Sequence, residues 1–69
     1  MEPFDIQLLE SHLRIEPLDN GLYRVMEEGN KLGVIYAEAN GDQVVWDTQD
    51  ELEKDFVQQI GELITEHNM

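Results

Sequence analysis

The chain of 69 residues contains no cysteine. This absence excludes disulfide bonds, thiolate metal ligands and thiol nucleophiles. Secreted domains of this size usually depend on disulfides, so a protein of the reducing cytoplasm is favoured. We expect one small domain over residues 1–69, because a chain of this length is near the minimum that can bury a core of its own.

Basic residues are scarce: four Lys and Arg stand against sixteen Asp and Glu, and the formal net charge is −12. Each contact with a phosphate backbone requires a Lys or Arg, so this charge opposes direct nucleic-acid binding. It also disfavours anionic membrane surfaces. The charge suits solubility, a basic protein partner, or imitation of a polyanion.

Long hydrophobic runs are missing as well. The longest, Val34-Ile35-Tyr36-Ala37, is far too short to cross a membrane. Residues 1–5 lack the basic region and apolar run of a signal peptide. We see no internal repeat, linker or low-complexity segment. A soluble cytoplasmic protein without a membrane segment is therefore expected.

A strong helical pattern is present in residues 49–67. Thr48 followed by Glu51 predicts a capping box at the start of this helix. Gly61 inside the helix costs about 1 kcal/mol relative to alanine, so it is either simply tolerated or marks the close approach of another backbone. The apolar residues that recur at steps of three and four, and so share one side of the helix, are Leu52, Phe56, Val57, Ile60, Leu63 and Ile64.

Residues 4–47 alternate with a period near two and contain turn signals at short intervals, which predicts an antiparallel meander. Asn40-Gly41 is typical of a two-residue type I′ hairpin loop, and Gly29-Asn30 is the next turn signal. With these two loops the expected pairs are Ile35 with Trp46, Tyr36 with Val45, Val25 with Val34, and Tyr23 with Tyr36.

The amino-terminal residues 4–16 allow two interpretations. As strands, a tight turn at Glu10-Ser11 pairs Leu8 with Leu13 and places five apolar residues on one side. As a helix, three apolar residues share a face. The strands align more apolar residues, whereas Glu-Ser is a poor hairpin loop, so the choice between hairpin and helix stays open.

Together these patterns predict an α+β fold: an antiparallel β-meander of four to five strands with one C-terminal amphipathic helix packed on one face. Arg24 is expected on the face beneath the helix, where a charged side chain is out of place. Either its aliphatic stem extends to the edge of the core and leaves the guanidinium in solvent, or a β-bulge shifts the register of this strand. The other residues expected on that face are Phe4, Ile6, Leu8, Leu13, Ile15, Leu22, Met26, Ile35, Ala37, Val44 and Trp46.

The opposite face of the expected sheet has an apolar centre and a polar rim, a composition typical of a protein interface. β-branched and aromatic residues are also good strand formers on either face, and a single register slip would exchange the two faces. Self-association is the simplest use of such a face, since two-fold contacts dominate small oligomers. The candidate interface residues are Tyr23, Val25, Leu32, Val34, Tyr36 and Val45.

The polar side of the helix carries a second candidate, an acidic stripe that would bind a basic protein surface. Its carboxylates extend over roughly 22 Å at 1.5 Å per residue, a scale at which a row of negative charge imitates a nucleic-acid backbone. An ordinary solvated helix face has the same composition. The acidic stripe consists of Glu51, Asp55, Glu62 and Glu66.

The sequence contains no recognisable catalytic motif. Neither His12 nor His67 has a neighbouring motif that would make it a general base, so we expect no enzyme and no catalytic residues. Residues 40–51 lack the spacing of an EF-hand loop, and the glycines form no phosphate-binding loop, so no metal or cofactor is expected. We interpret Trp46 and Phe56 as a contact between strand and helix in the core.

The sequence favours a small acidic cytoplasmic protein-interaction module that uses the open sheet face, with a homodimer as one form. The alternative from another class is an acidic nucleic-acid mimic that inhibits a nucleic-acid-binding protein. A small enzyme is a third alternative.

Overall fold

The computed structural model describes residues 2–68, which form a five-stranded antiparallel sheet and one α-helix. Each strand is hydrogen-bonded to the next one in sequence, so the order across the sheet is the order along the chain. The predicted α+β meander with a C-terminal helix is confirmed. The elements are β1 (Phe4–Leu8), β2 (Ser11–Pro17), a 3₁₀ turn η1 (Asp19–Gly21), β3 (Leu22–Glu27), β4 (Asn30–Asn40), β5 (Gln43–Thr48) and α1 (Lys54–His67).

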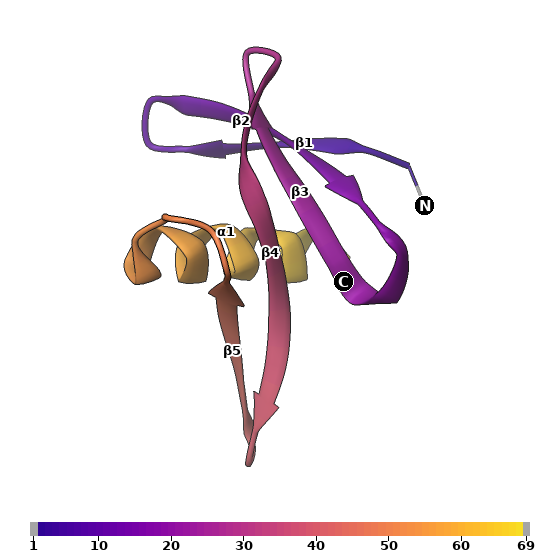
Figure 1. Ribbon diagram of the computed structural model, residues 1–69, viewed down its shortest axis with the longest axis vertical. Helices are drawn as coiled ribbons and strands as arrows, with labels where there is room; N and C mark the ends of the chain where they lie inside the picture. Colours follow the sequence, from indigo (N-terminus) through magenta and orange to yellow (C-terminus); the bar gives the residue numbers. More distant parts are fainter. Residues whose placement is uncertain (1, 69) are drawn as a thin grey trace.

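The sheet curls around α1, so that β1 and β2 run across the direction of β4 and β5 (Figure 1). The helix lies behind the sheet in this view and packs mainly against β5, with further contacts to β1 and β4. The rings of Phe4 and His67 are stacked with centroids 3.8 Å apart, which ties the first strand to the end of the helix. We call the two faces of the sheet the helix side and the outer face.

The core fills the space between the helix side of the sheet and α1. All five strands contribute to it, as does one side of the helix. Burying an aliphatic side chain contributes roughly 1.5–3 kcal/mol, so this cluster is the main stabilising feature of the fold. The buried hydrophobic residues are Ile6, Leu13, Ile15, Val25, Ile35, Trp46, Val57, Ile60 and Ile64.

Residues 4–16 form the β1–β2 hairpin, which decides between the two interpretations in favour of strands. The loop is Leu9-Glu10 rather than Glu10-Ser11, and Leu13 pairs with Ile6 rather than with Leu8. This register differs from the predicted one by two positions. Because side chains alternate with a period of two, the same residues still face the helix.

The predicted register of β3 against β4 is wrong by one position. The loop is Glu28-Gly29, in which both residues have positive φ as a type I′ turn requires. A β-bulge follows, with Leu32 as the extra residue, and Val25 therefore pairs with Gly33 instead of Val34. A shift of one position reverses which side of the sheet each β3 side chain occupies relative to β4.

The bulge also explains the misplaced arginine. Arg24 lies on the outer face, where its Nε donates a hydrogen bond to Oε1 of Glu16 at 2.6 Å. Leu22 and Met26 are likewise on the outer face, which corrects their predicted place beneath the helix. Tyr23 takes their place on the helix side. Of the two explanations for Arg24, the bulge is correct.

Beyond the helix, β4 and β5 continue as a two-stranded arm, seen at the bottom of Figure 1. Its loop is Gly41-Asp42, one residue later than predicted, so that Ala37 rather than Ile35 pairs with Trp46. The predicted positions of Ala37 and Val44 beneath the helix are wrong, since both are exposed. The physical reason is that the arm extends past the helix.

The helix begins at Lys54, so the predicted start near residue 49 and the capping box of Thr48 with Glu51 are wrong. Thr48 ends β5, and its hydroxyl donates to the carbonyl of Val34 at 2.7 Å and accepts the N–H of Asp50 at 3.1 Å. The carboxylate of Asp50 accepts the N–H of Val34 at 2.8 Å. β5 ends before it could pair with Val34, so the side chains of Thr48 and Asp50 satisfy the backbone carbonyl and N–H of Val34 instead.

Gly61 on α1 lies against the indole ring of Trp46, and a Cβ at this position would overlap the ring. Gly61 is therefore not simply a tolerated glycine, and the group that approaches it is a side chain rather than the backbone of the other alternative. The ring of Tyr23 lies 5.7 Å from that of Trp46, centroid to centroid. The backbone N–H of Trp46 donates a hydrogen bond to Oε1 of Gln58 at 3.0 Å. Phe56 packs against the same core cluster while remaining partly exposed.

Candidate functional site

The six residues of the predicted interface do not share one face. Val25 is fully buried in the core, and Tyr23 and Leu32 are partly buried against it. These three are committed to folding and leave little or no side chain for a partner. The register of β3, altered by the bulge, is the reason for this correction. The three that do lie on the outer face are Val34, Tyr36 and Val45.

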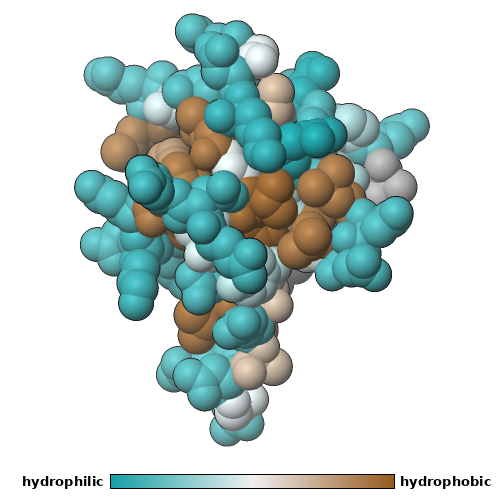
Figure 2. All heavy atoms as spheres, viewed as in Figure 1, coloured by the Kyte–Doolittle hydropathy of each residue, from teal (hydrophilic) through white to brown (hydrophobic). Residues whose placement is uncertain are grey.

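Leu22 joins the outer-face residues, because the observed register pairs it with Tyr36. Val45 is 37% exposed, and the other three are half-buried although the helix does not cover them. In Figure 2 hydrophobic residues gather in the middle of this face over β3 and β4, and hydrophilic residues surround them. We define the outer patch as Leu22, Val34, Tyr36 and Val45.

Leu22 lies on the surface, whereas the sequence pattern had placed it beneath the helix. The available signal was Arg24, since a charged side chain beneath the helix would have had to be desolvated. Moving β3 by one position puts Arg24 into solvent and brings Leu22 beside Tyr36. In the structure, the β-bulge at Leu32 produces this shift of β3 relative to β4.

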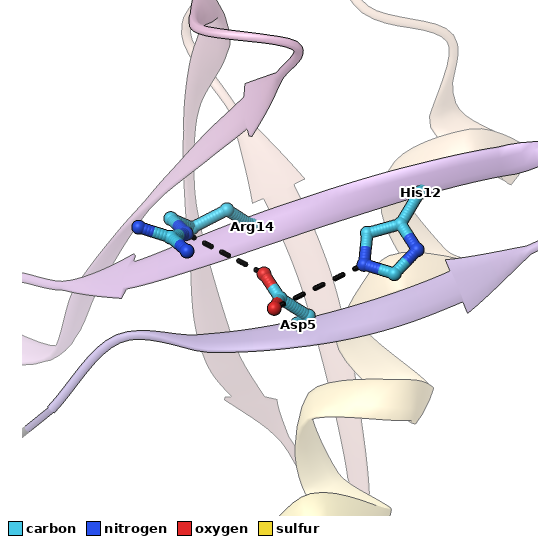
Figure 3. Close-up of polar contacts among 3 residues, drawn as sticks. All are labelled: Asp5, His12 and Arg14. Carbon is cyan, nitrogen blue, oxygen red and sulfur yellow. Dashed lines mark hydrogen bonds and ion pairs between the residues drawn. The ribbon is translucent and has the colours of Figure 1, made fainter.

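Charged residues beside the outer patch form cross-strand rows. Asp5 on β1 lies between two residues of β2: its carboxylate accepts the Nε–H of Arg14 at 3.4 Å, and Nε2 of His12 is 3.9 Å away (Figure 3). Arg24 and Glu16 form the neighbouring pair across β2 and β3. Exposed pairs of this kind stabilise a fold by at most about 1 kcal/mol. Together they place charges of both signs beside the outer patch.

Charge is distributed unevenly between the outer face and the rest of the molecule. Within residues 2–68, the strand register places three of the four Lys and Arg on the outer face but only four of the sixteen carboxylates, and Glu28 of the β3–β4 loop borders the same face. This face is close to neutral, whereas the remaining surface carries nearly all of the negative charge. The basic residues are Arg14, Arg24 and Lys31, and the acidic ones are Asp5, Glu16, Glu38 and Asp47.

Tyr36 presents a neutral hydroxyl within the outer patch. Burial raises the pKa of its phenol above the ordinary value, and the carboxylates of Asp47 and Glu38 raise this pKa further. A hydrogen bond with the side chain of Gln49 acts in the opposite direction and only partly offsets the rise. The hydroxyl therefore stays protonated at physiological pH and both donates and accepts hydrogen bonds.

An open concavity of about 510 Å³ lies at the β1–β2–β3 end of the outer face. His12 and Arg14 line it, yet the nitrogen of His12 is too far from the carboxylate of Asp5 for an oriented acid–base pair. Among residues 2–68, no three His, Asp or Glu side chains are grouped so as to hold a metal ion. The concavity therefore carries no catalytic proposal.

The acidic stripe is shorter than predicted. Asp55, Glu62 and Glu66 are exposed on α1, while Glu51 precedes the helix and is not part of its face. The cause is the late start of the helix, because Thr48 is held by β4. At 1.5 Å per residue the three remaining carboxylates extend over about 17 Å.

Comparison with known proteins adds no assignment: no family model, curated protein or solved structure matches this chain. Within residues 2–68, no helix has the length and hydrophobicity that crossing a membrane requires.

Proposed function

We propose that this protein is a small cytoplasmic interaction module that binds another protein through the outer patch. The observation that carries the proposal is a group of partly buried apolar side chains at the centre of a sheet face that the helix leaves uncovered. An apolar centre that includes Tyr, surrounded by oriented charges, has the composition of an interface core and rim. The absence of cysteine supports the cytoplasmic location.

The acidic stripe supports the alternative, a nucleic-acid mimic, less well. Its three helical carboxylates are exposed, but they form a short row without an adjoining apolar anchor on the same face of α1. Charge without a desolvated centre mainly accelerates association and gives little affinity. We therefore place the primary contact on the sheet.

Capture from a lysate of the source cells, followed by quantitative mass spectrometry, tests the choice of surface. We expect Tyr36→Ala to lose the specific partner that wild type retains, because it removes the aromatic centre of the outer patch. The matched variant Glu62→Lys with Glu66→Lys should retain it. Circular dichroism verifies that each variant is folded. Loss of the partner only in the charge-reversed variant would move the binding site to the acidic stripe.

A further inference from the structure

The outer side of β4 has an ordered sequence of side chains. Lys31 lies at one end and Glu38 at the other, with Val34 and Tyr36 between them. Both end residues are exposed, and both central residues are half-buried. A basic end, an apolar centre and an acidic end make a surface that is complementary to itself when one copy is reversed.

We infer that the partner of the outer patch, on the function proposed above, is a second copy of this chain, docked face to face over β4. The two-fold axis crosses the strands between Val34 and Tyr36. It places Val34 of one copy against Tyr36 of the partner subunit, and Lys31 against Glu38 of the partner subunit. Each contact occurs twice, as an isologous interface requires.

The distribution of charge argues for a second copy over a strongly basic partner. Such a partner would meet Arg14, Arg24 and Lys31 on the outer face, and the acidic surface elsewhere would attract it away from the patch. Two copies of a chain with net charge −12 repel each other over most orientations. The near-neutral outer face is where this repulsion is smallest, so self-association is directed to it.

The free edge of β5 is already capped by side chains where it passes the helix. The Trp46 N–H is already bonded to the side chain of Gln58, and the Thr48 N–H to the carboxylate of Asp47 at 2.7 Å. A strand from another molecule would have to displace these side chains to extend the sheet. Contact through the face requires no such displacement.

The dimer should be weak and reversible. The sheet curls around the helix, so β1 and β2 turn across the direction of β4, while β5 is the edge strand on the other side (Figure 1). Contact is then confined to β4 and its immediate neighbours. Interfaces that bury less than about 1,200 Å² in total are typically transient. We expect a monomer–dimer equilibrium that dilution shifts toward monomer.

Sedimentation velocity over a dilution series of the full chain tests the arrangement. Lys31→Glu and Glu38→Lys each replace two attractive contacts by two repulsive ones and should each weaken the dimer at least about tenfold. Mixing the two variants in equal amounts should restore it. In the mixed dimer the two introduced side chains, a glutamate and a lysine, face each other, and the unchanged Lys31 of one variant faces the unchanged Glu38 of the other. Lys54→Glu and Glu62→Lys make the same charge changes away from the patch and should have smaller effects.

A strictly monomeric wild type up to millimolar concentration would overturn the inference. A dimer that the mixture does not restore, or that the Lys54 and Glu62 controls weaken equally, would overturn the β4-on-β4 arrangement. The capture experiment separates these failures from that of the proposed function. If wild type is monomeric but Tyr36→Ala still loses a captured partner, self-association fails and the outer patch stands. If Tyr36→Ala also changes nothing, both fail.

Discussion

Tyr23 and Tyr36 lie on neighbouring strands of one sheet and face opposite sides of it. The ring of Tyr23 contacts Trp46 and belongs to the layer between sheet and helix. Tyr36 lies across from Leu22 on the outer face, where burial and then the neighbouring carboxylates raise the pKa of its phenol. The same residue type thus contributes to the core in one position and to a candidate contact surface in the other.

A single extra residue, Leu32, divides the apolar residues of β3 and β4 between core and surface. Without the bulge at Leu32, the register set by the β3–β4 loop would continue and pair Ile35 with Leu22 instead of Tyr23. Ile35 is fully buried in the observed fold. The bulge therefore brings Tyr23 and Ile35 together on the helix side and leaves Tyr36 outside.

Alanine substitutions of the two tyrosines should differ strongly in their effect on the free energy of unfolding. Tyr23→Ala should lower the free energy of unfolding by about 3 kcal/mol, because it removes an aromatic ring that packs on the core. Tyr36→Ala should cost less than about 1 kcal/mol, as surface substitutions usually do, while weakening association. Urea unfolding at a concentration where the protein is monomeric measures both. Equal losses of stability would contradict the assignment of the two faces.

The contact between Gly61 and Trp46 predicts a smaller loss of stability for a substitution at Gly61. Gly61→Ala should destabilise the protein by about 2 kcal/mol, because overlap with the indole outweighs the gain of about 1 kcal/mol in helix propensity. The exposed helix position Gln59→Ala is the matched control and should be neutral or slightly stabilising. Combining Gly61→Ala with Trp46→Leu should recover part of the alanine penalty in a double-mutant cycle. A higher melting temperature for Gly61→Ala alone would show that the close contact is absent.

The fold class and the helix were predictable because strong periodicity survives errors in loop position. In β1 and β2 a register wrong by two positions still left Ile6 and Leu13 on the helix side. In β3 an error of one position exchanged the faces. The local signal of the bulge is Gly33, directly after Leu32, because a glycine inside a strand often marks a bulge. The helix start was also misplaced, since the Thr48-x-x-Glu51 pattern competes with a tertiary hydrogen bond from Thr48 to Val34. Local pattern cannot report such long-range partners.

The β1–β2 loop offers a smaller change that should leave both faces untouched. Leu9 is 86% exposed and has φ +56, a left-handed conformation that leucine adopts unfavourably. Leu9→Asn should stabilise the monomer by about 0.5–1 kcal/mol without altering association, because asparagine tolerates this conformation. Glu10→Asn, in the same loop without a positive φ, should give no such gain. Thermal unfolding and sedimentation of both variants check the prediction.

The smallest effect concerns pH. Because the pKa of Tyr36 is raised in the folded state, its contribution to stability is present below the ordinary phenol pKa and is lost as pH rises through the raised value. Association should weaken over the same range, since a phenolate would join Asp47 and Glu38. The difference in ultraviolet titration between wild type and Tyr36→Phe isolates this group. Asp47→Asn should lower the pKa of Tyr36, because it removes a neighbouring negative charge. A wild-type Tyr36 that titrates at or below the ordinary phenol pKa would contradict the described environment.

Self-association through the outer face of the sheet, with the helix side committed to the core, can be tested residue by residue. Amide NMR spectra recorded from micromolar to millimolar protein provide this test. We predict concentration-dependent shifts at Lys31, Val34, Tyr36 and Glu38, with no change at buried Ile60. Shifts confined to the exposed carboxylates of α1, or spectra that do not depend on concentration at all, would contradict self-association through this face.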